Sequence, residues 1–170
     1  PEQLKSFAAA NADHALAGVA QLRIADEAYA AGKAADAVAG YDKALATLKS
    51  GPLAARAQLG RALAKVQAGK AAEATAELKQ LAGDANQPNG VRAEAAYDLA
   101  SLSAEAGNSA DVQKYSDQLL QIDPSSPWAQ RGMMLRASLP APAASAPAAA
   151  DPASKKDEGS PSIQLKLPGK

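Results

Sequence analysis

The chain has 170 residues, enough for one ordinary domain with a buried core and an additional segment. Its 18 basic and 18 acidic residues balance, so it lacks the basic excess that binds nucleic acid or anionic membranes. The absence of cysteine excludes disulfides, zinc fingers and thiol nucleophiles. Alanine is abundant and aromatic residues make up only 4%, a composition that favours closely packed helices.

The first part of the chain predicts a lead helix and then a pair of helices. Residues 2–10 form the lead helix, and Asn11 to Asp13 offer its end and the cap of the next helix. That next helix is expected from His14 to Ala31, where Gly32 ends it. Its partner carries apolar residues spaced by three and four positions: Val38, Tyr41, Leu45 and Leu48.

The same helix–turn–helix unit is then repeated. A second pair of helices is expected over about residues 52–68 and 71–81. A third pair begins with a helix over about residues 91–106, and its partner helix carries Val112, Tyr115, Leu119 and Ile122. The glycines at the three turns are spaced by 37 and 38 residues: Gly32, Gly69 and Gly107. Ser126 as cap and Pro127 at the first position begin a last helix that reaches about Leu139. A repeated unit of this kind buries its apolar face by stacking on its neighbours.

The order of small and large residues in each unit resembles the tetratricopeptide repeat. The matching positions are Ala25, Ala37, Tyr41 and Ala44 in the first unit, Ala62, Ala74 and Leu78 in the second, and Ala100, Val112, Leu119 and Pro124 in the third. The interval differs from the usual 34 residues, and Ser116 replaces the large residue of the third unit. The resemblance implies an all-α, right-handed solenoid of about three repeats with a lead helix and a C-terminal capping helix.

A narrower resemblance covers roughly residues 4–138. The segments "FAAANADHALAGVAQLRIADEAYAAGKAADAVAGYDKAL", "ARAQLGRALAKVQAGKAAEATAELKQL" and "QRGMMLRASL" are similar to the YfgM-like family, ancillary subunits of the bacterial Sec translocon. The resemblance implies a periplasmic or otherwise extracytoplasmic domain, anchored in the inner membrane by an N-terminal segment absent from this chain. It implies translocon subunits, periplasmic chaperones or exported chains as partners.

The residues that could carry chemistry do not form a catalytic or metal-binding pattern. His14 is the only histidine, and at a helix start it is expected to be solvated or to cap the helix. The segment from Asp84 to Ala95 is rejected as a calcium loop, because its glycine is one place late and its twelfth residue is alanine. Carboxylates are scattered on polar helix faces. We therefore predict no enzyme, no metal, no cofactor and no nucleic acid.

The family's concave positions on the first helix of each unit predict a partner-binding face. They form one column of Leu22, Leu59 and Tyr97, a second of Asp26, Leu63 and Ser101, and a third that begins at Tyr29. In an equally open alternative, several of these residues pack between helices and do not contact a partner. Trp128, with Met133, Met134 and Leu135, is expected to close the open end of the last repeat.

Four regions follow from these patterns: a lead helix over residues 1–12, a repeat domain over 13–139, a Pro/Ala/Ser-rich linker over 140–162 and a strand-like tail over 163–170. The tail could dock in a groove or mediate self-association. The expected function is a non-catalytic protein-interaction scaffold, by resemblance in protein export or periplasmic chaperone networks. The alternative is a cell-envelope assembly factor that acts through self-association.

Overall fold

The structure, a computed structural model, describes residues 2–12 and 14–139. The predicted linker and strand-like tail lie outside these residues. The described part is entirely helical, as the sequence predicts, and none of its helices is long and apolar enough to cross a bilayer. The helices are α1 (Glu2–Ala10), α2 (Ala15–Ala30), α3 (Ala34–Leu48), α4 (Pro52–Gln67), α5 (Ala71–Gly83), α6 (Asn89–Glu105), α7 (Ser109–Ile122) and α8 (Pro127–Ser138).

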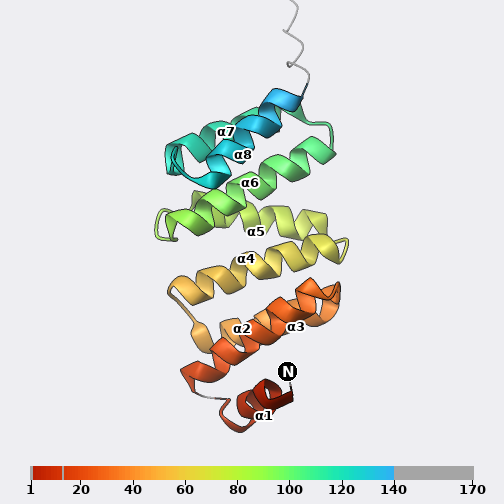
Figure 1. Ribbon diagram of the computed structural model, residues 1–170, viewed down its shortest axis with the longest axis vertical. Helices are drawn as coiled ribbons and strands as arrows, with labels where there is room; N and C mark the ends of the chain where they lie inside the picture. Colours follow the sequence, from red (N-terminus) through yellow and green to blue (C-terminus); the bar gives the residue numbers. More distant parts are fainter. Residues whose placement is uncertain (1, 13, 140–170) are drawn as a thin grey trace, which may run out of the picture.

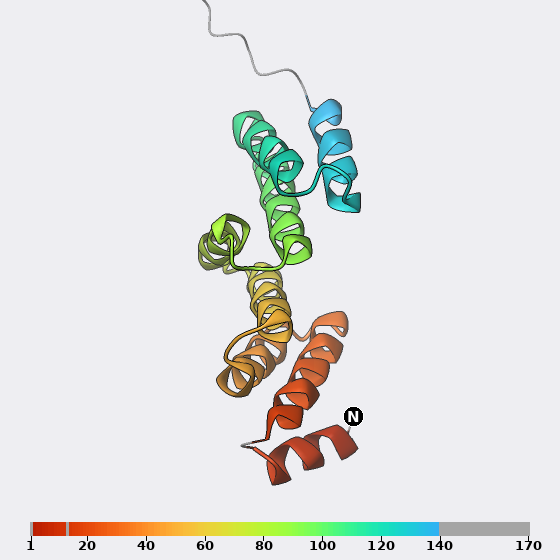
Figure 2. The ribbon, with the colours of Figure 1, turned by 90° about the vertical axis from the view of Figure 1, so that its left-hand side faces the viewer.

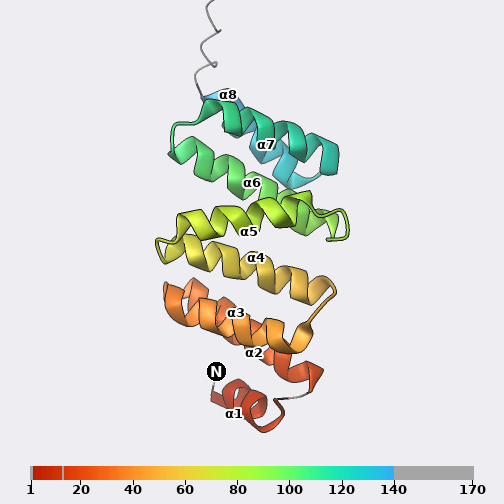
Figure 3. The same cartoon turned by 180° about the vertical axis from the view of Figure 1, so that it is seen from behind.

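Each helix packs against the next one along the chain, so the elements are stacked in sequence order along the long axis (Figure 1). Contacts also join α2 to α4, α4 to α6 and α6 to α8. The even-numbered helices therefore share one side of the molecule, and α3, α5 and α7 lie on the other (Figure 3). In Figure 2, α2 and α8 stand further out on the even-numbered side than α4 and α6 do, so this side curves inward.

Glycine ends the first helix of each pair through the same local structure. Gly32, Gly69 and Gly107 have φ angles of 72°, 77° and 72°, which only glycine adopts without a steric cost. The residue after each glycine donates its backbone N–H to a carbonyl five residues earlier; Lys33 does so to Ala28 at 2.9 Å. This Schellman arrangement satisfies carbonyls at the helix end and turns the chain back. The turn predicted at each glycine is thereby confirmed.

Alternation of small and large residues sets how closely the helices approach. A Cβ atom on Gly40 would lie 2.9 Å from the Cβ of Ala25, so α2 and α3 touch almost backbone to backbone. Tyr41 is buried, and its ring fills the space over Gly60 of α4, where an added Cβ would lie 2.5 Å from the ring. The large residue of one pair thus wedges against a glycine of the next.

The last helix closes the stack as predicted, with one difference. The Ser126 hydroxyl caps α8 by accepting from the backbone N–H of Ala129 at 3.1 Å. Trp128 and Leu135 pack against the core, whereas Met133 and Met134 are exposed. The small Ser116 suits its place because its hydroxyl donates to the carbonyl of Gly132 at 3.2 Å and leaves room for α8 to approach α7.

Candidate partner-binding face

Two of the seven predicted binding residues belong to the core instead. Leu22 is 6% exposed and packs with Tyr41 and Ala57, and Leu59 is 0% exposed and packs with Leu78. The prediction that Leu22 and Leu59 contact a partner is therefore wrong. The physical reason is the alanine-rich packing. It brings α3 and α4 close around Leu22, and it brings α5 and α6 close around Leu59.

Asp26 and Tyr29 of α2 are partly exposed, and Asp26 takes part in a hydrogen bond between two helices. Its Oδ1 accepts from the hydroxyl of Tyr41 at 2.6 Å, which ties α2 to α3. Burial, and after it this hydrogen bond, raises the pKa of Tyr41 above its usual range, so the phenol stays protonated and donating. Tyr29 packs against the same core cluster from its edge.

The remaining three predicted residues stay available on the even-numbered side. Leu63, Tyr97 and Ser101 are half-buried on α4 and α6, and the first two pack on the edge of the larger core cluster. Tyr97 also meets Trp128 of α8, with ring centroids 5.4 Å apart and planes inclined by 37°. This tilted geometry is typical of attractive aromatic pairs, and it gives α6 and α8 a shared aromatic surface.

A charged residue lies over one ring of this aromatic pair, and an ion pair joins α4 to α6. The Arg131 guanidinium carbon lies 4.8 Å from the centroid of the Trp128 ring, within the range of a cation–π interaction. Arg56 Nη1 of α4 lies 4.0 Å from Glu94 Oε1 of α6. We call Arg56, Glu94, Tyr97, Trp128 and Arg131 the aromatic-charged patch; it draws on three helices that lie apart in the sequence.

A nearly buried carboxyl group lies one helical turn beyond Glu94. Asp98 Oδ2 is buried and has no hydrogen-bond partner among the described residues. Burial, and after it the charge of Glu94, raises the pKa of Asp98 from 3.8 to about 7. Burial likewise raises the pKa of Glu94, against the opposing effect of Arg56 and Arg131. The patch therefore adjoins a carboxyl group whose charge changes near neutral pH.

From the sequence, Trp128 was expected to close the end of the last repeat, with a partner anchor as the less favoured alternative, and Glu94, Asp98 and Arg131 were not singled out as site residues. A local signal was present, because Glu94 and Asp98 flank Tyr97 on one helix face, and Arg131 follows Trp128 by three positions. What the sequence did not show is that α6 and α8 bring these two groups together.

The described residues contain no cluster of three or more His, Asp or Glu side chains that could hold a metal ion. His14 caps α2, because its Nδ1 accepts from the backbone N–H of Leu16 at 3.2 Å, which confirms the capping prediction. Asp84, from the rejected calcium loop, accepts from the backbone N–H of Asn86 at 2.9 Å in a local turn. Comparisons with protein families, with curated proteins and with solved structures found no match.

Proposed function

We propose that this chain is a non-catalytic protein-interaction domain, built as a right-handed solenoid of three tetratricopeptide-like repeats, which holds a partner segment on the face of its even-numbered helices. The observation that carries the proposal is the aromatic-charged patch. Its Tyr97–Trp128 pair and the guanidinium group of Arg131 come from α6 and α8, two of the helices on the inward-curving side. Partly exposed aromatic and arginine side chains are the groups that most often anchor protein interfaces.

The patch suits a peptide more than a small molecule. Its residues come from α4, α6 and α8, and the half-buried Leu63 and Ser101 lie on two of the same helices, α4 and α6. An apolar side chain of the partner would lie against the aromatic pair, and its backbone or charged groups would meet Glu94 and the two arginines. Both charge signs are present, so the patch selects by the placement of charges and not by net charge.

The biological setting proposed here follows from the resemblance of the sequence to the YfgM-like family. In that setting the domain is extracytoplasmic and anchored in the inner membrane, and it contacts translocon subunits, periplasmic chaperones or exported chains. The same resemblance supports the solenoid arrangement, together with the glycine turns that recur at 37 and 38 residues.

One observation favours the alternative, an envelope assembly factor that acts through self-association. Met133 and Met134 expose 43% and 73% of their surface on α8, at the end of the stack. Exposed methionines are common on adaptable binding surfaces, and a second copy could cover them.

A photocrosslinking experiment in the source cell distinguishes these two functions. A photoreactive phenylalanine derivative replaces Tyr97 or Trp128 in the full chain, and the control carries it at Ala46, an exposed residue of α3. Capture of translocon subunits, chaperones or exported chains from the patch positions alone supports the first function. Capture of only the protein's own copies supports the second, and equal capture from Ala46 refutes a specific role of the patch.

A further inference from the structure

Helix α8 occupies the place that the first helix of a fourth unit would have. A shift of 38 residues carries Ala57 of α4 to Ala95 of α6, and a shift of 37 carries Ala95 to Gly132 of α8. Each of these three small residues is buried, and contacts join α4 to α6 and α6 to α8. The three helices therefore present equivalent residues in the same register along the even-numbered side of the stack.

In this register, successive helices carry a positive, a negative and a positive side chain. The same shifts carry Arg56 to Glu94 and Glu94 to Arg131. Arg56 Nη1 lies 4.0 Å from Glu94 Oε1. The charges of Arg56 and Arg131 both oppose the rise that burial causes in the pKa of Glu94, so both guanidinium groups act on this carboxylate. Two arginines, one from each neighbouring helix, therefore share one glutamate.

The two arginines keep unused capacity for a partner. The Arg56 side chain exposes 50% of its surface and that of Glu94 only 22%, and Arg131 is exposed as well. A guanidinium group has five N–H donors, more than a shared carboxylate can occupy. Asp98 adds little negative charge at about pH 6, because burial and the charge of Glu94 raise its pKa to about 7. In mildly acidic solution the patch therefore carries two cations against one anion.

Apolar side chains lie beside these charges. Leu53, Val91 and Trp128 each precede the charged residue of their helix by three positions, so the two share a helix face. Leu53 is 46% exposed, and Trp128 is partly exposed where its ring meets that of Tyr97 at 5.4 Å between centroids. The register thus forms two rows across α4, α6 and α8, one apolar and one charged. An extended segment that crosses the three helices can contact both rows.

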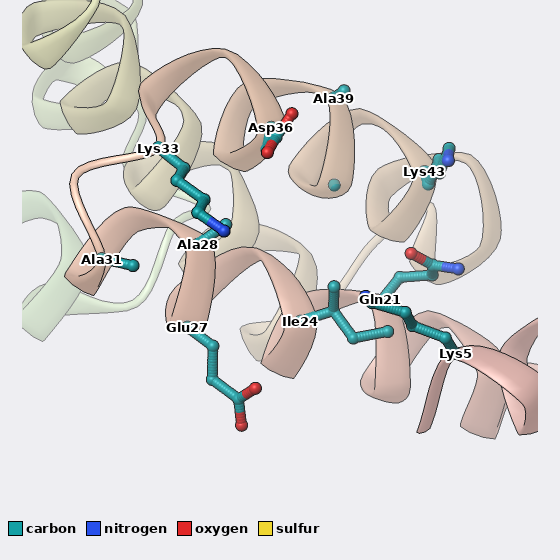
Figure 4. Close-up of a pocket in the computed structure, with 11 residues that line it drawn as sticks. Lys5, Gln21, Ile24, Glu27, Ala28, Ala31, Lys33, Asp36, Ala39 and Lys43 are labelled. Carbon is teal, nitrogen blue, oxygen red and sulfur yellow. The ribbon is translucent and has the colours of Figure 1, made fainter. Parts of the chain in front are cut away.

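A groove between α2 and α3 has lysines at its edge, but neither arginine nor aromatic side chains are among the described residues that line it. Its volume is about 410 Å³, and Ile24, Lys33 and Lys43 are part of its wall (Figure 4). Similar openings lie between α4 and α5 and among α5, α6 and α7, and a shift of 37 residues carries Ile24 to Arg61 and Lys43 to Gln80. The groove therefore follows from the pairing of two helices and is not special to the first repeat. Its lysines are a suitable control for nonspecific attraction of an acidic peptide.

We propose that the aromatic-charged patch binds an extended, acidic segment of a partner protein, with one carboxylate residue on Arg56, another on Arg131 and an apolar residue between them against the aromatic pair. This assignment rests on the function proposed above and adds the chemistry of the partner segment. Packed helices lie about 8–10 Å apart, so α4 and α8 are separated by about 16–20 Å. An extended segment rises about 3.3 Å per residue, which places the two carboxylates about five or six positions apart.

Three capped and fluorescently labelled peptides test the charge and its placement. The first carries glutamate at its first and sixth positions, leucine at the third and fourth, and serine elsewhere. The second carries lysine in place of both glutamates, and the third has its two glutamates adjacent, which keeps the net charge and changes the spacing. Binding to the full chain is followed by fluorescence anisotropy at low ionic strength and about pH 6, where charge pairs are least screened and glutamate is ionised. The first peptide should bind with a Kd of about 0.2 mM, and the other two at least about fivefold more weakly.

Charge reversal at the two arginines should reverse the choice of peptide. Arg56→Glu with Arg131→Glu should weaken the first peptide at least about tenfold and should bind the lysine peptide instead, a gain that an unfolded variant cannot show. Arg56→Gln with Arg131→Gln adds no negative charge beside Glu94 and should bind both peptides weakly. The matched control, Lys33→Glu with Lys43→Glu, changes the net charge equally at the groove of Figure 4 and should bind like the parent. Circular dichroism verifies the fold of each variant.

Four results would overturn the proposal. The first is no binding of the first peptide at about 2 mM, and the second is equal binding of the peptide with adjacent glutamates, which would reflect net charge alone. The third is a dimer, seen in sedimentation of the chain alone, that the arginine substitutions dissociate, because a second copy would then be the occupant. The fourth is photocrosslinked capture from position 97 that persists in Arg56→Glu with Arg131→Glu; it would remove the acidic segment and leave the proposed function standing. No capture from position 97 in the parent would remove both.

Discussion

Replacing Asp98 with asparagine tests the electrostatics of the candidate site directly. Asp98 lies largely buried on α6, its Oδ2 has no hydrogen-bond partner among the described residues, and its pKa is raised from 3.8 to about 7. A raised pKa means that the folded protein disfavours the charged carboxylate. While Asp98 stays protonated, the folded state carries no such penalty. The free energy of unfolding is therefore highest below pH 3.8, and it falls as the pH rises towards 7.

The size of this effect follows from the two pKa values. The interval from 3.8 to about 7 spans about three pH units, and at about 1.4 kcal/mol for each unit the carboxylate costs about 4 kcal/mol above pH 7. This figure is an upper bound, because water can reach the carboxylate when it ionises. Asparagine keeps the shape without the charge, so Asp98→Asn should be more stable than the parent above pH 7 and close to it near pH 4.

Urea unfolding of both proteins between pH 4 and pH 8 measures the difference in the free energy of unfolding. The difference should grow through this window and level off above pH 7. Asp117→Asn is the control, because Asp117 is exposed and pairs with Arg136 at the surface. A difference between Asp98→Asn and the parent that stays constant from pH 4 to pH 8 would refute the assignment of a buried, proton-binding carboxyl group.

Three further substitutions test the packing and the helix ends. Gly60→Ala should lower the free energy of unfolding in urea by about 1–3 kcal/mol, because the added Cβ would lie 2.5 Å from the Tyr41 ring. Gly90→Ala is the control, because its Cβ would meet open space and should leave the free energy of unfolding unchanged. Gly107→Ala should lower the free energy of unfolding by about 1 kcal/mol, because alanine adopts a φ of 72° only at a steric cost. An unchanged free energy of unfolding of the full chain would contradict the turn structure. Ser126→Ala should lower the melting temperature by removing about 1 kcal/mol of capping, and amide exchange should quicken in the first turn of α8 if this reasoning holds.

The helices and their ends were predictable because they depend on neighbours in the chain. Gly32 and Ser126 act within five residues of themselves, through a left-handed turn and a capping hydroxyl, so their roles can be read locally. The cap of α2 was predicted within the segment Asn11–Asp13, but His14, the next residue, occupies that position.

The exposure of the candidate binding residues was predicted only in part, because exposure depends on what packs over a residue. Leu22, Leu59 and Tyr97 hold the same position in successive repeats, yet the two leucines are core residues and the tyrosine is partly exposed. Tyr41 and its neighbours cover Leu22, and α5 covers Leu59. No property of the residues themselves separates the three, since the difference lies in the helices around them.

By itself, then, the sequence determined that this protein is helical, where its helices begin and end, and that one unit recurs at intervals of 37 and 38 residues. The tertiary structure alone decided that Trp128 meets Tyr97, that Asp98 is buried beside Glu94, and that Leu22 and Leu59 are core residues whereas Tyr97 is partly exposed. The physical reason is the distance along the chain over which each interaction acts. Hydrogen bonds at turns and caps act over a few residues, whereas burial and charge coupling depend on residues that only packing brings together.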